Sequence, residues 1–256
     1  MIPSALEHVQ EIAGASGHVA VFLDYDGTLT PIVSQPENAS LSDAMRETLN
    51  ELAARVPLAI LSGRDLNDVR RCVAIDSILY AGSHGFDIAG PGGLRRETAT
   101  ELLPELDVAE KELRAALDGI SGARVQRKRF SIAAHYRNVS KNDLSKVHCA
   151  VSDVLERHPE LRRLDGKQVC ELLPGVDWDK GKAVLWLLET LRAKRKNLSP
   201  IYVGDDSTDE DAFRAIEQRG CGIVVSEQSQ PTAAKFSLKN PAEVERFLRE
   251  LAARLS

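Results

Sequence analysis

Two aspartates stand directly after an apolar run, where they could perform metal-assisted nucleophilic chemistry. Residues 19–23 are Val-Ala-Val-Phe-Leu, and Asp24, Tyr25, Asp26 and Gly27 follow them. An apolar run bounded by turn residues predicts a strand that is buried on both faces. Burying carboxylates beside such a strand is unfavourable unless a cation or hydrogen bonds compensate for it. An aspartate nucleophile that works beside a bound metal ion would meet this requirement.

The spacing of these acids suits the hydrolysis of a phosphate monoester. Asp24 at the end of the strand is the candidate nucleophile, which would form an aspartyl-phosphate intermediate. Asp26, two residues further on, is the candidate general acid and then the general base for the attacking water. Gly27 permits a sharp turn there. The alternative is a plain Asp-Gly turn in which Asp24 only caps a helix.

Three further clusters contain groups that such a reaction needs. Ser62 follows a predicted strand at 57–61 and could donate to a phosphoryl oxygen, although Ser-Gly is also a common turn. Lys180 opens an apolar helix and could neutralise the phosphate and the nucleophile together. Asp205 begins an acidic stretch, residues 205–211, which could hold a cation or could form a favourable acidic first turn of a helix. Oxygen ligands without histidine favour Mg²⁺ over zinc.

Apolar runs that alternate with helical patterns would position these groups. Strands are predicted at 19–23, 57–61, 78–81, 200–203 and 220–225, and helices at 41–56, 65–72, 180–191 and 241–255. Alternation of strands and helices predicts a parallel sheet with right-handed crossovers. The fold class is therefore α/β, with a Rossmann-like parallel-sheet core, and residues 1–87 and 175–256 are assigned to it.

The pattern between these two parts is different. Helices are predicted at 103–120 and 142–157, and strands at 124–128, 130–136, 161–164 and 168–172. This order of strand, strand, helix, strand, strand is typical of an antiparallel α+β unit. Residues 88–174 are therefore predicted to form an inserted cap domain.

Composition limits the class of protein. The 256 residues carry a formal net charge of -5, which argues against a general nucleic-acid binder. Residues 1–15 contain no apolar core of the length typical of a signal peptide, and no apolar run is long enough to span a membrane. Cys72, Cys149, Cys170 and Cys221 form no paired motif and fit a reducing compartment. We therefore expect a cytoplasmic protein that acts on a small molecule.

Together these motifs resemble those of the haloacid-dehalogenase-like phosphatases. Within that superfamily the likeness is to trehalose-6-phosphate phosphatases and extends over about residues 18–250. It is carried by residues 23–32, Gly82 to Gly85, His135 to Arg137, Trp178 to Lys182 and Gly204 to Phe213. Members that cleave carbon–halogen bonds lack the acid found here as Asp26, so its presence points to phosphoryl transfer.

The resemblance implies a magnesium-dependent hydrolase of trehalose biosynthesis that converts trehalose 6-phosphate to trehalose and phosphate. It assigns Mg²⁺ to Asp24, Asp205 and the backbone carbonyl of Asp26, and phosphate to Ser62 and Lys180. It also implies that the inserted domain closes over the sugar. Pairing with a trehalose-phosphate synthase would fit this activity, and an inactive regulatory partner of such a synthase is the remote alternative.

Sugar recognition is the part of the resemblance in which this sequence departs from the family pattern. Lys128 and Glu171 match the family's sugar-binding positions, whereas Gln126 replaces a glutamate and Leu173 replaces an arginine. Gln126 shares a strand face with Lys128 and could still hydrogen-bond a hydroxyl, but without the strength of a carboxylate. Arg137 is a further candidate for substrate binding. These departures keep another glycosyl phosphate, such as glucosylglycerol phosphate, open as the substrate.

Overall fold

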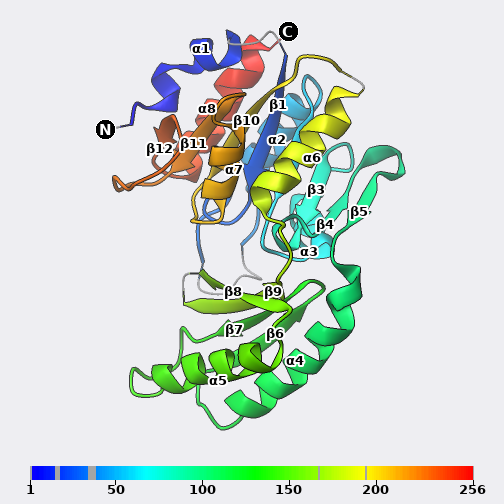
Figure 1. Cartoon of the computed structure of the whole chain (residues 1–256). Coiled ribbons are helices and arrows are strands. Elements are labelled where there is room, and N and C mark those ends of the chain that lie inside the picture. The colour runs from blue at the N-terminus through cyan, green and yellow to red at the C-terminus, as the bar shows by residue number, and fades with distance from the viewer. Residues whose placement is uncertain (1, 15–17, 34–38, 167, 194, 256) are drawn as a thin grey trace. The chain divides into compact units, whose positions relative to one another are not determined.

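A computed structural model describes residues 2–14, 18–33, 39–166, 168–193 and 195–255 (Figure 1). All the predicted site residues lie in these parts. The chain divides into two compact units. The first unit comprises Met1–Arg96 and Trp178–Ser256, and the second comprises Glu97–Asp177.

A mainly parallel sheet forms the centre of the first unit. Its described strands follow the order β12-β11-β10-β1-β2-β3-β4-β5. They are β1 Val19–Asp24, β2 Leu58–Leu61, β3 Leu79–Gly82, β4 Asp87–Ala89, β5 Arg95–Glu97, β10 Ser199–Gly204, β11 Cys221–Val225 and β12 Phe236–Leu238. Strand β1 lies in the interior and pairs in parallel with β10 and with β2.

Helices cover both faces of this sheet, which explains why β1 is apolar along its whole length. Val21 and Leu23 of β1 pack into a core with α1, α2, α3 and α8, whereas Phe22 packs with α6 and α7 on the other face. Every residue of β1 is buried. The helices are α1 Val9–Gly14, α2 Asp43–Ala53, α3 Leu66–Val73, α6 Lys180–Arg192, α7 Asp209–Ile216 and α8 Pro241–Arg254.

The second unit pairs an antiparallel sheet with two helices. Its strands follow the order β6-β7-β9-β8. The elements are α4 Leu103–Leu117, β6 Arg124–Lys128, β7 Ser131–His135, α5 Leu144–Arg157, β8 Leu161–Gly166 and β9 Val169–Pro174. Ile132, Ala134 and Leu172 from one sheet face share a core with residues of α4 and α5. Because successive strand residues alternate in direction, the neighbouring residues lie on the opposite face.

The predicted α/β class with a parallel-sheet core is confirmed. The boundary of the inserted domain differs from the prediction. The prediction was residues 88–174, whereas the second compact unit is Glu97–Asp177. The second unit begins only at Glu97, since β4 pairs antiparallel with β3 and β5 follows at the same end of the core sheet. No helix in the described ranges has both the length and the apolar character needed to cross a membrane.

Candidate active site

Three predicted site residues meet at one edge of the core sheet. Asp24 is the last residue of β1, Ser62 follows β2, and Asp205 follows β10. Both neighbouring strands run parallel to β1, so their carboxyl ends lie beside the carboxyl end of β1. Ligands of open α/β sheets bind at this edge.

A buried lysine bridges two buried carboxylates at this edge. Lys180 Nζ donates to Asp24 Oδ1 and to Asp209 Oδ1, both at 2.8 Å. The three residues are only 5 % (Asp24), 3 % (Lys180) and 0 % (Asp209) exposed. Lys180 is the first residue of α6, and the side chain of Asp179 caps that helix by accepting from the backbone N–H of Lys182. The structure therefore places Lys180 directly beside Asp24, the candidate nucleophile.

Asp209 is a site residue that the sequence did not single out. Its Oδ1 also accepts from the Tyr202 hydroxyl at 2.6 Å, and its Oδ2 accepts from the backbone N–H groups of Asp205 and Asp206 at 3.0 and 2.9 Å. A Cβ on Gly204 would lie 2.3 Å from Asp209 Cγ, so the missing side chain makes room for this carboxylate. The acidic stretch was visible in the sequence, but Asp209 there fitted an acidic first turn equally well.

Burial and like charges oppose ionisation within this group. Burial raises the pKa of the Asp24 carboxyl well above its usual range, Lys180 acts against that shift, and Asp209 and Asp205 add to it. Burial alone would lower the pKa of Lys180, but Asp209 and Asp24 outweigh it and hold that pKa well above its ordinary value. The formal charges of two carboxylates and one ammonium leave this buried trio with one excess negative charge.

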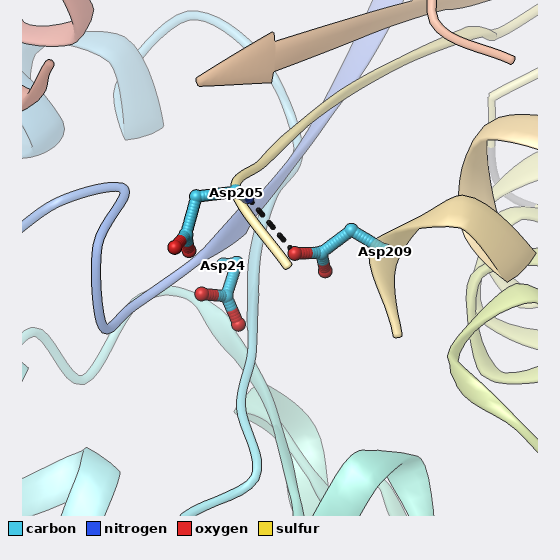
Figure 2. Close-up of side chains that lie close together, drawn as sticks. All are labelled: Asp24, Asp205 and Asp209. Carbon is cyan, nitrogen blue, oxygen red and sulfur yellow. Dashed lines mark hydrogen bonds between the residues drawn. The ribbon is translucent and has the colours of Figure 1, made fainter. Parts of the chain in front are cut away.

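The residues at this edge fit a hard divalent cation. Asp24, Asp205 and Asp209 each offer a carboxylate oxygen, and these atoms lie within 4.8 Å of one another (Figure 2). Thr28 Oγ1 donates to Asp205 Oδ1 at 3.4 Å. Gly27 has a φ of +88°, and a Cβ there would lie 2.2 Å from Asp205 Oδ2. An oxygen-only donor set with excess negative charge favours Mg²⁺.

The side chain of Asp26 points to a different partner. Both of its carboxylate oxygens accept from the guanidinium of Arg64, at 2.7 Å each. The acidic group in the structure therefore contains Asp209 beside Asp24 and Asp205, and it does not contain the Asp26 carboxylate. A contribution of Asp26 to metal binding through its backbone carbonyl stays a prediction.

Ser62 lies in a loop whose backbone is tightly fixed. It is 1 % exposed, and its Oγ accepts from the backbone N–H of Arg64 at 3.1 Å. The Ser62 carbonyl accepts from the N–H of His84, whose φ is +57°. A Cβ on Gly63 would lie 2.8 Å from the His84 ring. His84 therefore packs against this loop, and the role of Ser62 in phosphate binding stays a prediction.

In the second unit, three predicted substrate-binding residues share one sheet face. Gln126 of β6 and Glu171 of β9 both lie in register with Ala133 of β7, and Lys128 is two residues after Gln126. This face is opposite the one that packs on α4 and α5. Lys128 Nζ donates to the Glu171 carboxylate.

His135 also lies on this face. Its Nε2 is 3.0 Å from Gln126 Oε1, so the amide that replaces the family's glutamate makes a definite contact. Arg137, the fourth predicted residue, lies beyond the end of β7 and is exposed. Its part in substrate binding stays a prediction.

Comparison with known proteins assigns the family. A family profile described as trehalose-phosphatase matches residues 22–242. The chain belongs to the trehalose-phosphatase family. The resemblance inferred from the motifs is thereby confirmed.

Relatives of this trehalose-phosphatase cover nearly the whole chain. A trehalose 6-phosphate phosphatase of Zea mays is 41 % identical over 98 % of this chain and 74 % of its own length. A trehalose-phosphate phosphatase of Mycobacterium tuberculosis is 44 % identical over 99 % of this chain and 66 % of its own length. The solved C-terminal domain of a Candida albicans trehalose-6-phosphate phosphatase has a TM-score of 0.85 at 21 % identity, covering 99 % of this chain and 98 % of that one. The last match shows the fold alone.

The raised pKa of Asp24 predicts that any stabilisation by a cation bound at this acidic group depends on pH. A raised folded pKa means that the metal-free folded state holds a proton that the unfolded chain releases at lower pH. This contribution to stability is therefore present at low pH and is lost as pH rises through the folded pKa, at most about 1.4 kcal/mol per pH unit. Because Mg²⁺ favours the ionised carboxylate, it should raise the melting temperature more at about pH 8 than at about pH 6.

Thermal unfolding with EDTA or with excess Mg²⁺ at both pH values measures this difference. Asp205→Asn provides the comparison, because it removes one acid from the group and should reduce the Mg²⁺ effect. An equal Mg²⁺ effect at both pH values in the unmodified protein would contradict the prediction.

Proposed function

We propose that this chain hydrolyses trehalose 6-phosphate to trehalose and phosphate, with Asp24 as nucleophile. The observation that carries the proposal is the buried ion pair between Lys180 and Asp24 at the carboxyl edge of the sheet, with Asp205 and Asp209 beside it. Lys180 orients the attacking carboxylate, and its positive charge attracts the substrate phosphate. The names of the relatives support the sugar.

The reaction proceeds in two displacements. An Asp24 carboxylate oxygen attacks phosphorus, the bond from phosphorus to the sugar oxygen breaks, and Asp26 donates a proton to the departing oxygen. Asp26 then takes a proton from water as the water oxygen attacks phosphorus. The bond from phosphorus to Asp24 breaks, and inorganic phosphate leaves. Ser62 donates a hydrogen bond to a phosphoryl oxygen in both steps.

We propose Mg²⁺ as the cofactor, held by Asp24, Asp205 and the backbone carbonyl of Asp26. Its chemistry is electrostatic, because a bound dication keeps Asp24 ionised and offsets the charge of the phosphoryl oxygens. Asp209 holds the N–H groups of Asp205 and Asp206, so it fixes the loop that carries a metal ligand. The chain's own residues thus supply the nucleophile, the proton transfers and the orientation.

The second unit is proposed to recognise the sugar through one sheet face. Lys128 and Glu171 form an ion pair, and a sugar hydroxyl can accept from the ammonium and donate to the carboxylate. Ala133 of β7 lies in register between Gln126 and Glu171. Gln126 replaces the family's glutamate and contacts His135, so the sugar-binding face differs from the family pattern. Another glycosyl phosphate, such as glucosylglycerol phosphate, is therefore the competing substrate.

A cytoplasmic location fits the thiols. All four cysteines are free, as is usual in a reducing compartment. Functional pairing with a trehalose-phosphate synthase, which would supply the substrate, is part of the proposal. The pairing predicts that a coupled assay with such a synthase yields trehalose.

Phosphate release from a panel of sugar phosphates, each with Mg²⁺ and with EDTA, tests the function. The highest kcat/KM is expected for trehalose 6-phosphate with Mg²⁺. A preference for glucose 6-phosphate or glucosylglycerol phosphate would overturn the assigned substrate. Equal rates with EDTA would overturn the assigned cofactor.

A further inference from the structure

A buried arginine holds the carboxylate of Asp26 on both oxygens. Arg64 Nε donates to Asp26 Oδ2, and a terminal guanidinium nitrogen donates to Asp26 Oδ1, each at 2.7 Å. The Arg64 side chain is 9 % exposed, whereas that of Asp26 is 41 % exposed. Two parallel charge-assisted hydrogen bonds fix the direction of a carboxylate as well as its distance. Arg64 therefore determines where the carboxyl group of Asp26 lies.

Arg64 is itself held by contacts on several sides. Its other terminal nitrogen donates to Asp68 at 3.1 Å, and its guanidinium lies 5.2 Å from the centre of the Tyr25 ring. Its backbone N–H donates to Ser62 Oγ, and its carbonyl accepts from Ser83 at 2.6 Å. The arginine that orients Asp26 is thus part of the loop that carries Ser62.

We propose that Arg64 is a positioning residue for proton transfer by Asp26, a proposal that rests on the proposed function. Arg64 acts through Asp26, because its guanidinium fork sets the rotamer from which the carboxyl group reaches the departing oxygen. The loop shared with Ser62 would keep the acid aligned with the phosphoryl group during the proton transfer.

Comparing Arg64→Lys with Arg71→Lys tests this role. Lysine keeps the positive charge but cannot form a fork. Arg71 lies on α3, the helix that follows Arg64, and its side chain is 80 % exposed, so its replacement controls for loss of a nearby arginine. Each variant is compared by kcat/KM, which reports the displacement of the leaving group and not the later attack of water. The substrates are trehalose 6-phosphate, whose alcohol leaves poorly without a proton, and p-nitrophenyl phosphate, whose leaving group needs no proton.

General acid catalysis accelerates a reaction by roughly 10²–10⁴-fold, and displacing the acid from its position should remove part of this acceleration. For Arg64→Lys we expect kcat with trehalose 6-phosphate to fall about 10- to 100-fold, with little change in KM. With p-nitrophenyl phosphate kcat/KM should change less than about threefold, and Arg71→Lys should match the unmodified protein with both substrates. Equal losses with both substrates, or no loss with either, would overturn the role of Arg64.

Asp26→Asn separates this proposal from the proposed function. If Asp26 is the acid, its replacement lowers kcat/KM with the sugar phosphate far more than kcat/KM with the aryl phosphate. Equal losses there would remove Asp26 as the acid, and with it the premise for Arg64. If the unmodified protein rejects trehalose 6-phosphate, another alkyl phosphate that it hydrolyses replaces it, and the comparison still decides the role of Arg64.

A spectroscopic readout covers the case in which Arg64→Lys does not fold. The Nε–H of Arg64, held at 2.7 Å from Asp26, should give a slowly exchanging signal in ¹⁵N NMR of the unmodified protein. The signal should shift and exchange faster in Asp26→Asn, because an amide replaces the carboxylate that accepts both hydrogen bonds from the Arg64 guanidinium. An unchanged signal would show that the fork does not hold Arg64 to Asp26, and the proposal would fail.

Discussion

Asp24→Asn is expected to abolish phosphate release, with a loss of roughly 10⁴-fold or more in kcat. The amide of asparagine is too weak a nucleophile to form an acyl phosphate, and none of the other acids ends the central strand beside Lys180. The fold should remain, because the change removes a negative charge from a buried group that carries one in excess. The metal-free variant should therefore unfold at the same temperature as the unmodified protein, or above it.

Phosphate release with trehalose 6-phosphate, alongside thermal unfolding with EDTA, measures both halves of this result. Asp211→Asn is the matched control, since that acid is on α7 with its side chain 44 % exposed, and it pairs with Arg214. Mass spectrometry of the assayed sample excludes reversion of the asparagine to aspartate by deamidation. Substantial activity in a sample free of reverted protein would remove Asp24 from the nucleophile's role. A loss of folding would show that the charge of Asp24 supports the structure.

The sequence located those site residues that follow strands or open helices. Asp24, Ser62 and Asp205 could be predicted because apolar runs mark the strands, and parallel strands bring their ends together. Lys180 could be placed because it opens a helix that is apolar on most sides. Each of these inferences needs only local pattern and the rule that α/β sheets bind ligands at one edge.

Asp209 and Arg64 could not be located in the same way. Asp209 is fully buried because α7 directs its side chain toward Tyr202 and the loop after β10. An exposed aspartate in the acidic first turn of a helix would show the same sequence pattern. Arg64 is 38 residues from Asp26 in the chain, and no periodicity shows that its side chain returns to the neighbouring strand. Such contacts depend on tertiary packing and on side-chain direction.

The edge of the core sheet was misjudged for a related reason. Strand β5, Arg95–Glu97, consists of charged residues and has no apolar alternation. Strand β4 is only three residues long. Both belong to the core sheet because of their pairing, which short segments do not reveal in sequence. In contrast, β6 was predicted with its bounds as observed, Arg124–Lys128.

Lys180→Met is expected to abolish activity and to destabilise the protein, because it leaves Asp24 and Asp209 buried without their shared cation. Removing one partner of a buried ion pair typically lowers the free energy of unfolding by about 3–5 kcal/mol. Methionine has a similar length, so packing changes little. Lys182→Met, on the same helix at a partly exposed position, should have a small effect on both properties. Urea unfolding with EDTA measures the stability, and phosphate release with Mg²⁺ measures the activity.

The double variant Lys180→Met with Asp209→Asn shows whether charge is the cause. If the uncompensated carboxylates destabilise Lys180→Met, removing one of them should restore part of the stability, so the two changes should not add. Activity should stay absent, because the Lys180 ammonium group, which would contact both the phosphate and Asp24, is still missing. If stability does not recover, lost packing around Lys180 is the cause and the electrostatic account of the site is wrong. If the stability of Lys180→Met equals that of the unmodified protein, the two carboxylates do not need Lys180 as their counter-ion, and its place in the site is catalytic alone.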